Sequence, residues 1–384
     1  MKKGTFSILA ITAFSTMLGV SVISPFLPAF AKQHGANGFW LGMIFAGFGI
    51  SRGIIMPIVG RVSDRTGRKV FVSAGLLLFS VISLLYPVVE GVYALTAVRL
   101  VHGVAAGMVM PIVIAYIGES AEKGREGATT GGMNMMFYMG LAAGPLLGGL
   151  LDQYFGFDAV FHAMATLGVL TFLIVFFFLP DIKAKEGEAP EDLRKFSSLI
   201  KYGFIKAVLV IAVISTLMMA VFISFVPSLA DTVNVNTEHI GVIISLGIFL
   251  AGILQIPFGR LSDRFDRPGK LIQIGAGMSV GMVAVLVMPL CPDFTALVVA
   301  GALLGVGASI AVPALTGISV SIGERYGMGA WMGILHAAMS VGLVLTPLVF
   351  GVVMDHLGIH AVFYLLGLVV FFGTSGYLLY IRRV

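Results

Sequence analysis

Long apolar runs separated by short polar segments dominate the order of residues along the chain. The runs 5–30, 70–89 and 271–290 contain no charged residue. About 20 apolar residues suffice to cross the hydrocarbon core of a bilayer as a helix, which pairs its own backbone donors and acceptors. The pattern predicts an all-α integral membrane protein of twelve transmembrane helices, at 5–30, 38–59, 70–89, 93–117, 128–151, 159–180, 207–229, 240–258, 271–290, 295–322, 330–353 and 361–381.

Composition agrees with this pattern and argues against a soluble enzyme. Hydrophobic residues make up 58% of the chain and charged residues 11%, whereas about 25% of a soluble domain is charged. The single cysteine, Cys291, excludes an intramolecular disulfide. No nucleophile–base pair, phosphate-binding loop or Cys/His metal cluster stands out in the sequence. We therefore expect no enzyme activity, no metal and no cofactor.

The positions of Lys and Arg predict how the chain crosses the membrane. If both termini are cytoplasmic, all 24 basic residues except Lys32, Arg52 and Arg99 fall in cytoplasmic segments. The net charge of +5 is then a topology signal and no indication of nucleic-acid binding. We expect a multi-pass protein of the cell membrane, monomeric, whose partners are membrane lipids and a small-molecule substrate.

The sequence divides into two similar halves. Residues 181–203 form a charged connector between two groups of six predicted helices, 1–180 and 204–384. The hexapeptide that starts at Gly60 recurs from Gly259, and Ala159-Val160-Phe161 recurs as Ala361-Val362-Phe363. Matches in the same order, at offsets of 199 to 202 residues, indicate a duplication. Two repeats of the same topology predict a substrate site between them near the bilayer midplane.

The loop after the second predicted helix carries a dense charged motif. It reads Gly60-Arg61-Val62-Ser63-Asp64-Arg65-Thr66-Gly67-Arg68-Lys69. Gly60 and Gly67 permit a tight turn, and Asp64 can accept hydrogen bonds from the start of a neighbouring helix. Arg65, Arg68 and Lys69 are expected to hold the loop at the anionic inner leaflet. A basic loop that serves only topology is the alternative interpretation.

This loop resembles the most specific signature of the major facilitator superfamily, and the likeness extends over the whole chain. The resemblance implies two six-helix bundles, with Asp64 and its basic neighbours latching the cytoplasmic gate in one conformation. The second copy contains Gly259, Asp263 and Arg264 but departs from the pattern after Arg264. Its latch is expected to be weaker.

The fifth predicted helix contains a pattern of small residues around Gly144-Pro145. The spacing G-x8-G-x3-G-P-x2-G-G runs from Gly131 to Gly149 and resembles the signature of the antiporter, drug-exporting branches of the superfamily. Such residues let helices approach closely, and Gly-Pro supplies a bend. Generic helix packing is the alternative interpretation of the individual glycines.

Two arginines fall within predicted helices, whereas all 19 acidic residues fall in loops or at helix ends. Intramembrane charges usually face a wet cavity and have a partner. Arg52 and Arg99 could therefore pair with an anionic substrate, although snorkelling to the interface or pairing with backbone carbonyls is the alternative. Arg99 also opens an Arg-x-x-x-Gly motif that, by resemblance, is associated with proton coupling. Histidine is the side chain whose ordinary pKa lies near neutral pH, so His102 and His336 are candidate proton carriers, or else packing residues.

Polar residues in other predicted helices complete the candidate site. Asn134, Tyr138 and Gln255 are expected to face an interior cavity. The resulting hypothesis is a secondary active transporter that works by alternating access. We expect proton-coupled export (antiport) of a small amphiphilic or anionic organic solute. An importer or facilitator of a small metabolite, and a non-transporting membrane receptor or scaffold, are the alternatives.

Overall fold

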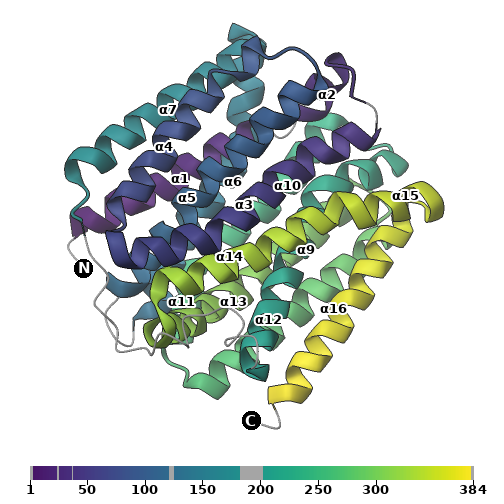
Figure 1. Cartoon of the computed structure of the whole chain (residues 1–384). Coiled ribbons are helices and arrows are strands. Elements are labelled where there is room, and N and C mark those ends of the chain that lie inside the picture. The colour runs from purple at the N-terminus through teal and green to yellow at the C-terminus, as the bar shows by residue number, and fades with distance from the viewer. Residues whose placement is uncertain (1–2, 24–25, 37, 121–124, 182–201, 382–384) are drawn as a thin grey trace. The chain divides into compact units, whose positions relative to one another are not determined.

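The computed structural model describes residues 3–23, 26–36, 38–120, 125–181 and 202–381 of the chain (Figure 1). Within these ranges every regular element is a helix, and twelve helices are long and apolar enough to cross a membrane. The all-α class and the number of spans predicted from the sequence are confirmed. The basic residues of the connector at 182–201 lie outside the described residues.

The first compact unit comprises residues 1–121, 139–189 and 322–340. In it α3 packs against α5, α4 against α5 and α7, and α1 against α7. Its core is mostly aliphatic, with aromatic residues among them, and the rings of Tyr86 and Phe161 stack with centroids 4.9 Å apart. Its complete elements are α1 (Lys3–Val22), α2 (Leu27–Gln33), α3 (Gly38–Thr66), α4 (Lys69–Ser83), η1 (Tyr86–Val88), α5 (Val92–Ser120) and α7 (Phe157–Phe178).

The second compact unit comprises residues 122–138, 190–321 and 341–384. In it α12 packs against α16, and α9 packs against α16 and α10. Its complete elements are α9 (Gly203–Thr232), α10 (Thr237–Ile253), α11 (Gln255–Asp263), α12 (Arg267–Val287), η3 (Met288–Leu290), α13 (Phe294–Tyr326), η4 (Thr346–Phe350), α15 (Gly351–Leu357) and α16 (Ile359–Ile381).

Two helices contribute to both units. The start of α6 (Glu126–Phe155) belongs to the second unit and its remainder to the first. The start of α14 (Met328–Leu345) belongs to the first unit and its end to the second. The start of α6, from the N-terminal half of the sequence, is thus part of the second unit, and the start of α14, from the C-terminal half, is part of the first. The predicted division into bundles at 1–180 and 204–384 stays a prediction.

Three spans that were expected to be continuous α-helices are interrupted, and two others, 70–89 and 271–290, end in the 3-10 helices η1 and η3. The predicted span 5–30 contains the end of α1 at Val22 and the start of α2 at Leu27. The predicted span 240–258 is divided at Leu254, and 330–353 passes through the π-helical segment η4. Proline accounts for the position of each change, because it lacks the N–H that would continue the ladder and its ring crowds the preceding turn. Pro28, Pro257 and Pro347 lie within or beside these interruptions.

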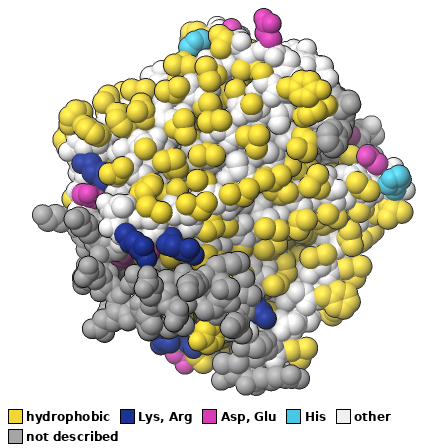
Figure 2. Space-filling model, in the orientation of Figure 1, with side chains coloured by type: hydrophobic (Ala, Val, Ile, Leu, Met, Phe, Trp, Pro, Cys, Tyr) yellow, Lys and Arg dark blue, Asp and Glu magenta, His cyan; other side chains and the backbone are white. Residues whose placement is uncertain are grey.

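Hydrophobic side chains cover most of the visible surface, and the charged side chains lie toward the helix ends (Figure 2). Val70, Phe177 and Phe178 are 62%, 67% and 71% exposed. A water-soluble protein rarely exposes a continuous apolar surface of this extent. We infer that lipid hydrocarbon, and not water, covers this apolar surface.

Candidate functional site

Asp64 lies at the end of α3 and joins it to the start of α14. Its Oδ1 accepts a hydrogen bond from the Gly329 N–H at 2.8 Å, and its Oδ2 accepts one from the Ala330 N–H at 2.8 Å. A carboxylate is stabilised there by the positive end of the helix dipole. Gly60 allows this approach, because a Cβ on it would overlap the Gly329 carbonyl. The predicted hydrogen bonds from a neighbouring helix start are confirmed, and the gating role of Asp64 remains a prediction.

Arg68, in the turn that follows α3, forms two ion pairs inside the protein. Its Nη2 donates to Asp64 Oδ1 at 2.9 Å and to Glu119 Oε1 at 2.6 Å, and its side chain is fully buried. The prediction that Arg68 lies at the lipid headgroups was therefore wrong, because two carboxylates compensate its charge inside the protein. Arg65 is exposed. Gly67 adopts a φ of 101°, a conformation that favours glycine.

Asp263 repeats the arrangement in the second unit. At the end of α11, its Oδ1 accepts from Gly127 N–H at 2.6 Å and its Oδ2 from Ala128 N–H at 2.8 Å, at the start of α6. Gly259 approaches Gly127 as Gly60 approaches Gly329. The two copies differ in their arginines: Arg267, the counterpart of Arg68, lies over the Phe204 ring at 4.0 Å. Asp263 makes no ion pair with any described residue, in agreement with a weaker second latch.

The glycines of α6 bring it close to its neighbours. A Cβ on Gly144 would overlap Ser21 of α1, and the Ser21 hydroxyl donates to the Gly140 carbonyl at 3.2 Å. In the second unit a Cβ on Gly131 would lie 2.6 Å from the Gln255 carbonyl oxygen. Pro145 lies within the continuous helix. Close approach by small residues, as the sequence pattern predicted, is confirmed.

Arg99 and His102 belong to a buried polar cluster in the first unit. Arg99 is 5% exposed; its Nε donates to the Ile44 carbonyl at 3.4 Å, and its guanidinium lies 4.7 Å from the centre of the Phe48 ring. His102 is fully buried, and its Nδ1 is 2.9 Å from the Tyr86 hydroxyl. Snorkelling of Arg99 to the interface is excluded by this burial, because a backbone carbonyl and an aromatic face hold the cation inside.

Arg52 and His336 meet where α3 packs against α14. A Cβ on Gly53 would lie 3.2 Å from Ser340 Cβ, which fixes this contact, and Arg52 is close enough to His336 for their charges to interact. The Nδ1 of His336 donates to the Met332 carbonyl at 2.9 Å. Arg52 is half-buried, and no described carboxylate pairs with it. It is a cation within a membrane span that lacks an anionic partner among the described residues.

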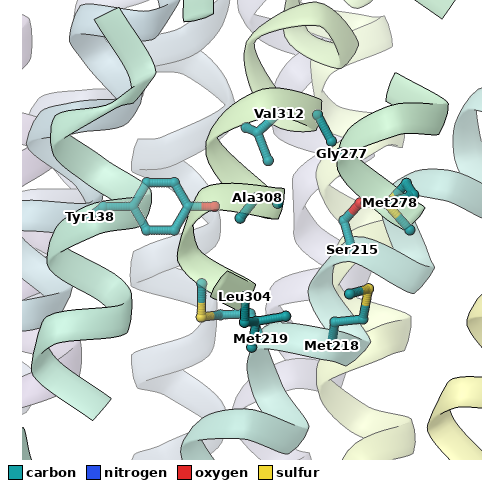
Figure 3. Close-up of a pocket in the computed structure, with 11 residues that line it drawn as sticks. Tyr138, Ser215, Met218, Met219, Gly277, Met278, Leu304, Ala308 and Val312 are labelled. Carbon is teal, nitrogen blue, oxygen red and sulfur yellow. Dashed lines mark hydrogen bonds between the residues drawn. The ribbon is translucent and has the colours of Figure 1, made fainter. Parts of the chain in front are cut away.

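The other three candidates lie in the second unit. Asn134 donates to the Thr316 hydroxyl at 3.3 Å. Gln255 is fully buried, and its side-chain amide has no partner among the described residues. Tyr138 projects from α6 into a pocket between α9, α12 and α13 (Figure 3). We call this the methionine pocket; it is lined by Tyr138, Ser215, Met218, Met219, Gly277, Met278, Leu304, Gly307, Ala308, Ala311 and Val312.

Sequence reasoning missed Tyr86, Glu119 and the methionine pocket. Tyr86 and Glu119 lie at helix ends, where polar residues are common, and only their contacts distinguish them. Methionine and alanine within apolar runs look like ordinary helix packing. The closely spaced small residues Gly301, Gly305 and Gly307 of α13 were the available signal, since they permit other helices to approach.

The comparisons with known proteins agree with this architecture. A sequence model of the Major Facilitator Superfamily matches residues 9–222 and 208–384. The chain is 28% identical to an uncharacterised MFS-type transporter of Methanocaldococcus jannaschii over 364 residues, 94% of this chain and 93% of the relative. It is 27% identical to the quinolone resistance protein NorA of Staphylococcus aureus over 362 residues, 92% and 91% of the two chains.

A solved structure shows the same fold. The human organic anion transporter MFSD10 superposes with a TM-score of 0.83 at 17% sequence identity, over 97% of this chain and 98% of that chain. Transporters of this family use ion gradients and need no cofactor, and the described residues contain no group of three or more potential metal ligands. The chain belongs to the Major Facilitator Superfamily and is a multi-pass membrane transporter, not an enzyme.

Proposed function

We propose that this transporter is a proton-coupled exporter of small amphiphilic or anionic organic solutes, and that it works by alternating access. The observation that carries the substrate class is Arg52, a half-buried cation in a span without a described carboxylate partner. Export is supported by the small-residue pattern of α6 and by the similarity to a quinolone resistance protein over 92% of the chain.

The charge argument begins with the cost of an ion in hydrocarbon. An arginine at the helix centre costs at least about 2.5–3.5 kcal/mol on insertion scales, so it is retained where it faces water or a counter-ion. A substrate carboxylate would supply that counter-ion through charge-assisted hydrogen bonds. Quinolones, for which one relative is named, carry a carboxylate on a planar ring system and so belong to this class.

The gate follows from the two latches. Each holds the end of one helix against the start of another by two hydrogen bonds to a single carboxylate, Asp64 or Asp263. These bonds are few and lie near helix ends, so they can break and re-form at modest cost. We assign the latches to the closed state of the side that the Lys and Arg pattern predicts to be cytoplasmic.

A second function, proton-coupled uptake of an anion, is favoured by one observation. The Ser340 hydroxyl donates to the His336 carbonyl at 3.0 Å, and Ser340 packs against Gly53, the residue that follows Arg52. An anion bound at Arg52 would offset the repulsion between the guanidinium and a protonated imidazole, so the anion and the proton would bind together and move in the same direction. The same argument does not extend to His102. Its neighbouring cation, Arg99, already contacts the Ile44 carbonyl and the Phe48 ring.

Flux into proteoliposomes under an imposed pH gradient separates these functions. The purified full-length chain is reconstituted, and uptake of a fluorescent quinolone is followed. An antiporter accumulates the compound when the lumen is acidic, because protons leave as the compound enters. A symporter accumulates it when the outside is acidic, and a facilitator equilibrates it under either gradient. Uptake driven only by an acidic exterior would overturn the export proposal.

A further inference from the structure

The methionine pocket lies within the second unit, where four helices meet. Three methionines line it, Met218 and Met219 from α9 and Met278 from α12, together with aliphatic residues of α13. The space not filled by atoms in and around the pocket is about 340 Å³, and this volume includes open solvent. Among the residues that the structure describes, no Asp, Glu, Lys, Arg or His lines it. A ligand that enters it must therefore present an uncharged group.

Small residues shape this pocket. A Cβ on Gly277 of α12 would lie 2.5 Å from the Ala311 nitrogen and 2.6 Å from the Gly307 carbonyl oxygen of α13. The two backbones therefore touch at this level, which leaves no large side chain between them. Ala308 faces the pocket from the adjacent turn of α13 (Figure 3). The space exists because glycine and alanine occupy positions that a larger residue would fill.

Two hydroxyl groups reach the pocket, and they differ in their partners. The Ser215 hydroxyl donates to the sulfur of Met278 at 3.3 Å. The Tyr138 hydroxyl points into the pocket (Figure 3), and it makes no hydrogen bond to any residue that the structure describes. A polar group that faces an apolar pocket without a partner gains stability when a ligand supplies one.

We propose that the methionine pocket binds an uncharged group of the transported solute: a single aromatic ring with one hydrogen-bonding substituent that meets the Tyr138 hydroxyl, with no claim on where the rest of the solute lies. Methionine side chains are flexible and polarizable, and they make favourable contacts with aromatic rings. This inference rests on the proposed function for the claim that the bound molecule is transported. The binding itself rests only on the pocket.

The test compares two compounds that differ by one hydroxyl group. The probes are 4-phenylbutanoate and 4-(4-hydroxyphenyl)butanoate, and their dissociation constants are measured by calorimetry on the purified full-length chain. We expect the hydroxyl compound to bind about 3- to 10-fold more tightly, the range for one net hydrogen bond. Tyr138→Phe keeps the ring but removes the hydroxyl, so it is expected to abolish this preference.

A second pair of variants tests whether the pocket is the site. Ala308→Phe fills the space and is expected to weaken both compounds at least about 10-fold, as loss of a buried ring contact should. Val299→Phe adds the same side chain on α13 at a position that is 62% exposed, and it is expected to bind both like the wild type. Met219→Ala enlarges the pocket and is expected to shift the preference toward a naphthyl analogue.

Several outcomes would overturn the assignment. They are equal binding by Ala308→Phe and Val299→Phe, a hydroxyl preference that survives Tyr138→Phe, and no binding of either probe to the wild type at millimolar concentration. Unchanged elution and melting temperature show that each variant is folded. If the binding pattern holds but pH-driven flux is absent, the proposed function fails and the pocket stands. The variants are also titrated with 4-phenylbutanol, which keeps the ring but lacks the carboxylate. This measures binding of the ring to the pocket independently of any need for an anion.

Discussion

Two arginines lie within membrane spans of the first unit, and their surroundings assign them different roles. Arg99 is 5% exposed and is held by the Ile44 carbonyl and the Phe48 ring. Arg52 is half-buried, with its Nε unpaired among the described residues and the titratable His336 nearby. We therefore expect Arg99 to stabilise the bundle and Arg52 to bind a ligand.

Arg52→Gln should lower affinity for an anionic solute by about 10- to 100-fold, the range for a hydrogen bond to a charged group. The amide keeps a donor but loses the charge, so a neutral analogue should bind as it does to the wild type. Paired titrations of 4-phenylbutanoate and 4-phenylbutanol into the purified variant measure both effects. Arg61→Gln, at an exposed position of the same helix, is the matched control. Equal losses for both compounds would show that Arg52 acts on folding and not on charge.

At the scale of the helices, the two latches share their hydrogen bonds but differ in their ion pairs. Asp64 accepts from two amides of α14 and also compensates the buried Arg68, whereas Asp263 accepts only from two amides of α6. We expect Asp64→Asn to open its latch more than Asp263→Asn opens the second. An amide can satisfy one N–H but cannot neutralise a buried guanidinium.

Hydrogen exchange followed by mass spectrometry measures this difference. In Asp64→Asn, the amides at the start of α14 should exchange at least about tenfold faster, which corresponds to about 1.4 kcal/mol of local opening. In Asp263→Asn, the start of α6 should change by less. Asp266→Asn is a suitable control, since Asp266 caps α12 through the Gly269 N–H at 2.9 Å and touches no latch. A larger increase in exchange rate in Asp263→Asn than in Asp64→Asn would contradict the prediction that the Asp64 latch depends more on its carboxylate.

Helix boundaries show what the sequence could and could not predict. Each span was evident from its apolar run, but the effect of each proline was not. Pro57, Pro111, Pro145, Pro227 and Pro313 lie inside continuous helices. Pro257 lies in the first turn after the break at Leu254, and Pro347 lies in the π-helical segment η4. Every proline removes one N–H. Whether the helix continues depends on neighbouring helices that re-satisfy the freed carbonyl, which a single segment does not encode.

The candidate site shows the same division between local and distant information. The Asp64 motif and the α6 glycines were recognisable because their residues are close together in sequence. The burial of Arg68 depends on Glu119, 51 residues away. The contact between α3 and α14 joins Met56 to Ser340, 284 residues apart, and it alone places Arg52 beside His336. Contacts of this kind follow from the three-dimensional fold.

At the scale of the whole molecule, the duplication constrains the topology. Repeats of six helices, an even number, must enter and leave on the same side, so that corresponding loops of the two halves face the same compartment. Glu90 and Asp293 are exposed and lie in corresponding loops of the two halves. Arg61 and Arg325 are also exposed, and they lie at helix ends that the predicted topology places on the other side of the membrane. The basic pair is expected to be cytoplasmic and the acidic pair outside.

Single cysteines test this arrangement in living cells. The native thiol of Cys291 is buried, and burial together with the Asp293 carboxylate raises its pKa, so it reacts slowly at neutral pH. In a Cys291→Ser background, a membrane-impermeant maleimide should label Glu90→Cys and Asp293→Cys on intact cells. Arg61→Cys and Arg325→Cys should react only after permeabilisation. Labelling of Glu90→Cys outside and Asp293→Cys inside would mean that the halves are inverted, and rocking of two parallel repeats about a shared site could not then be the transport mechanism.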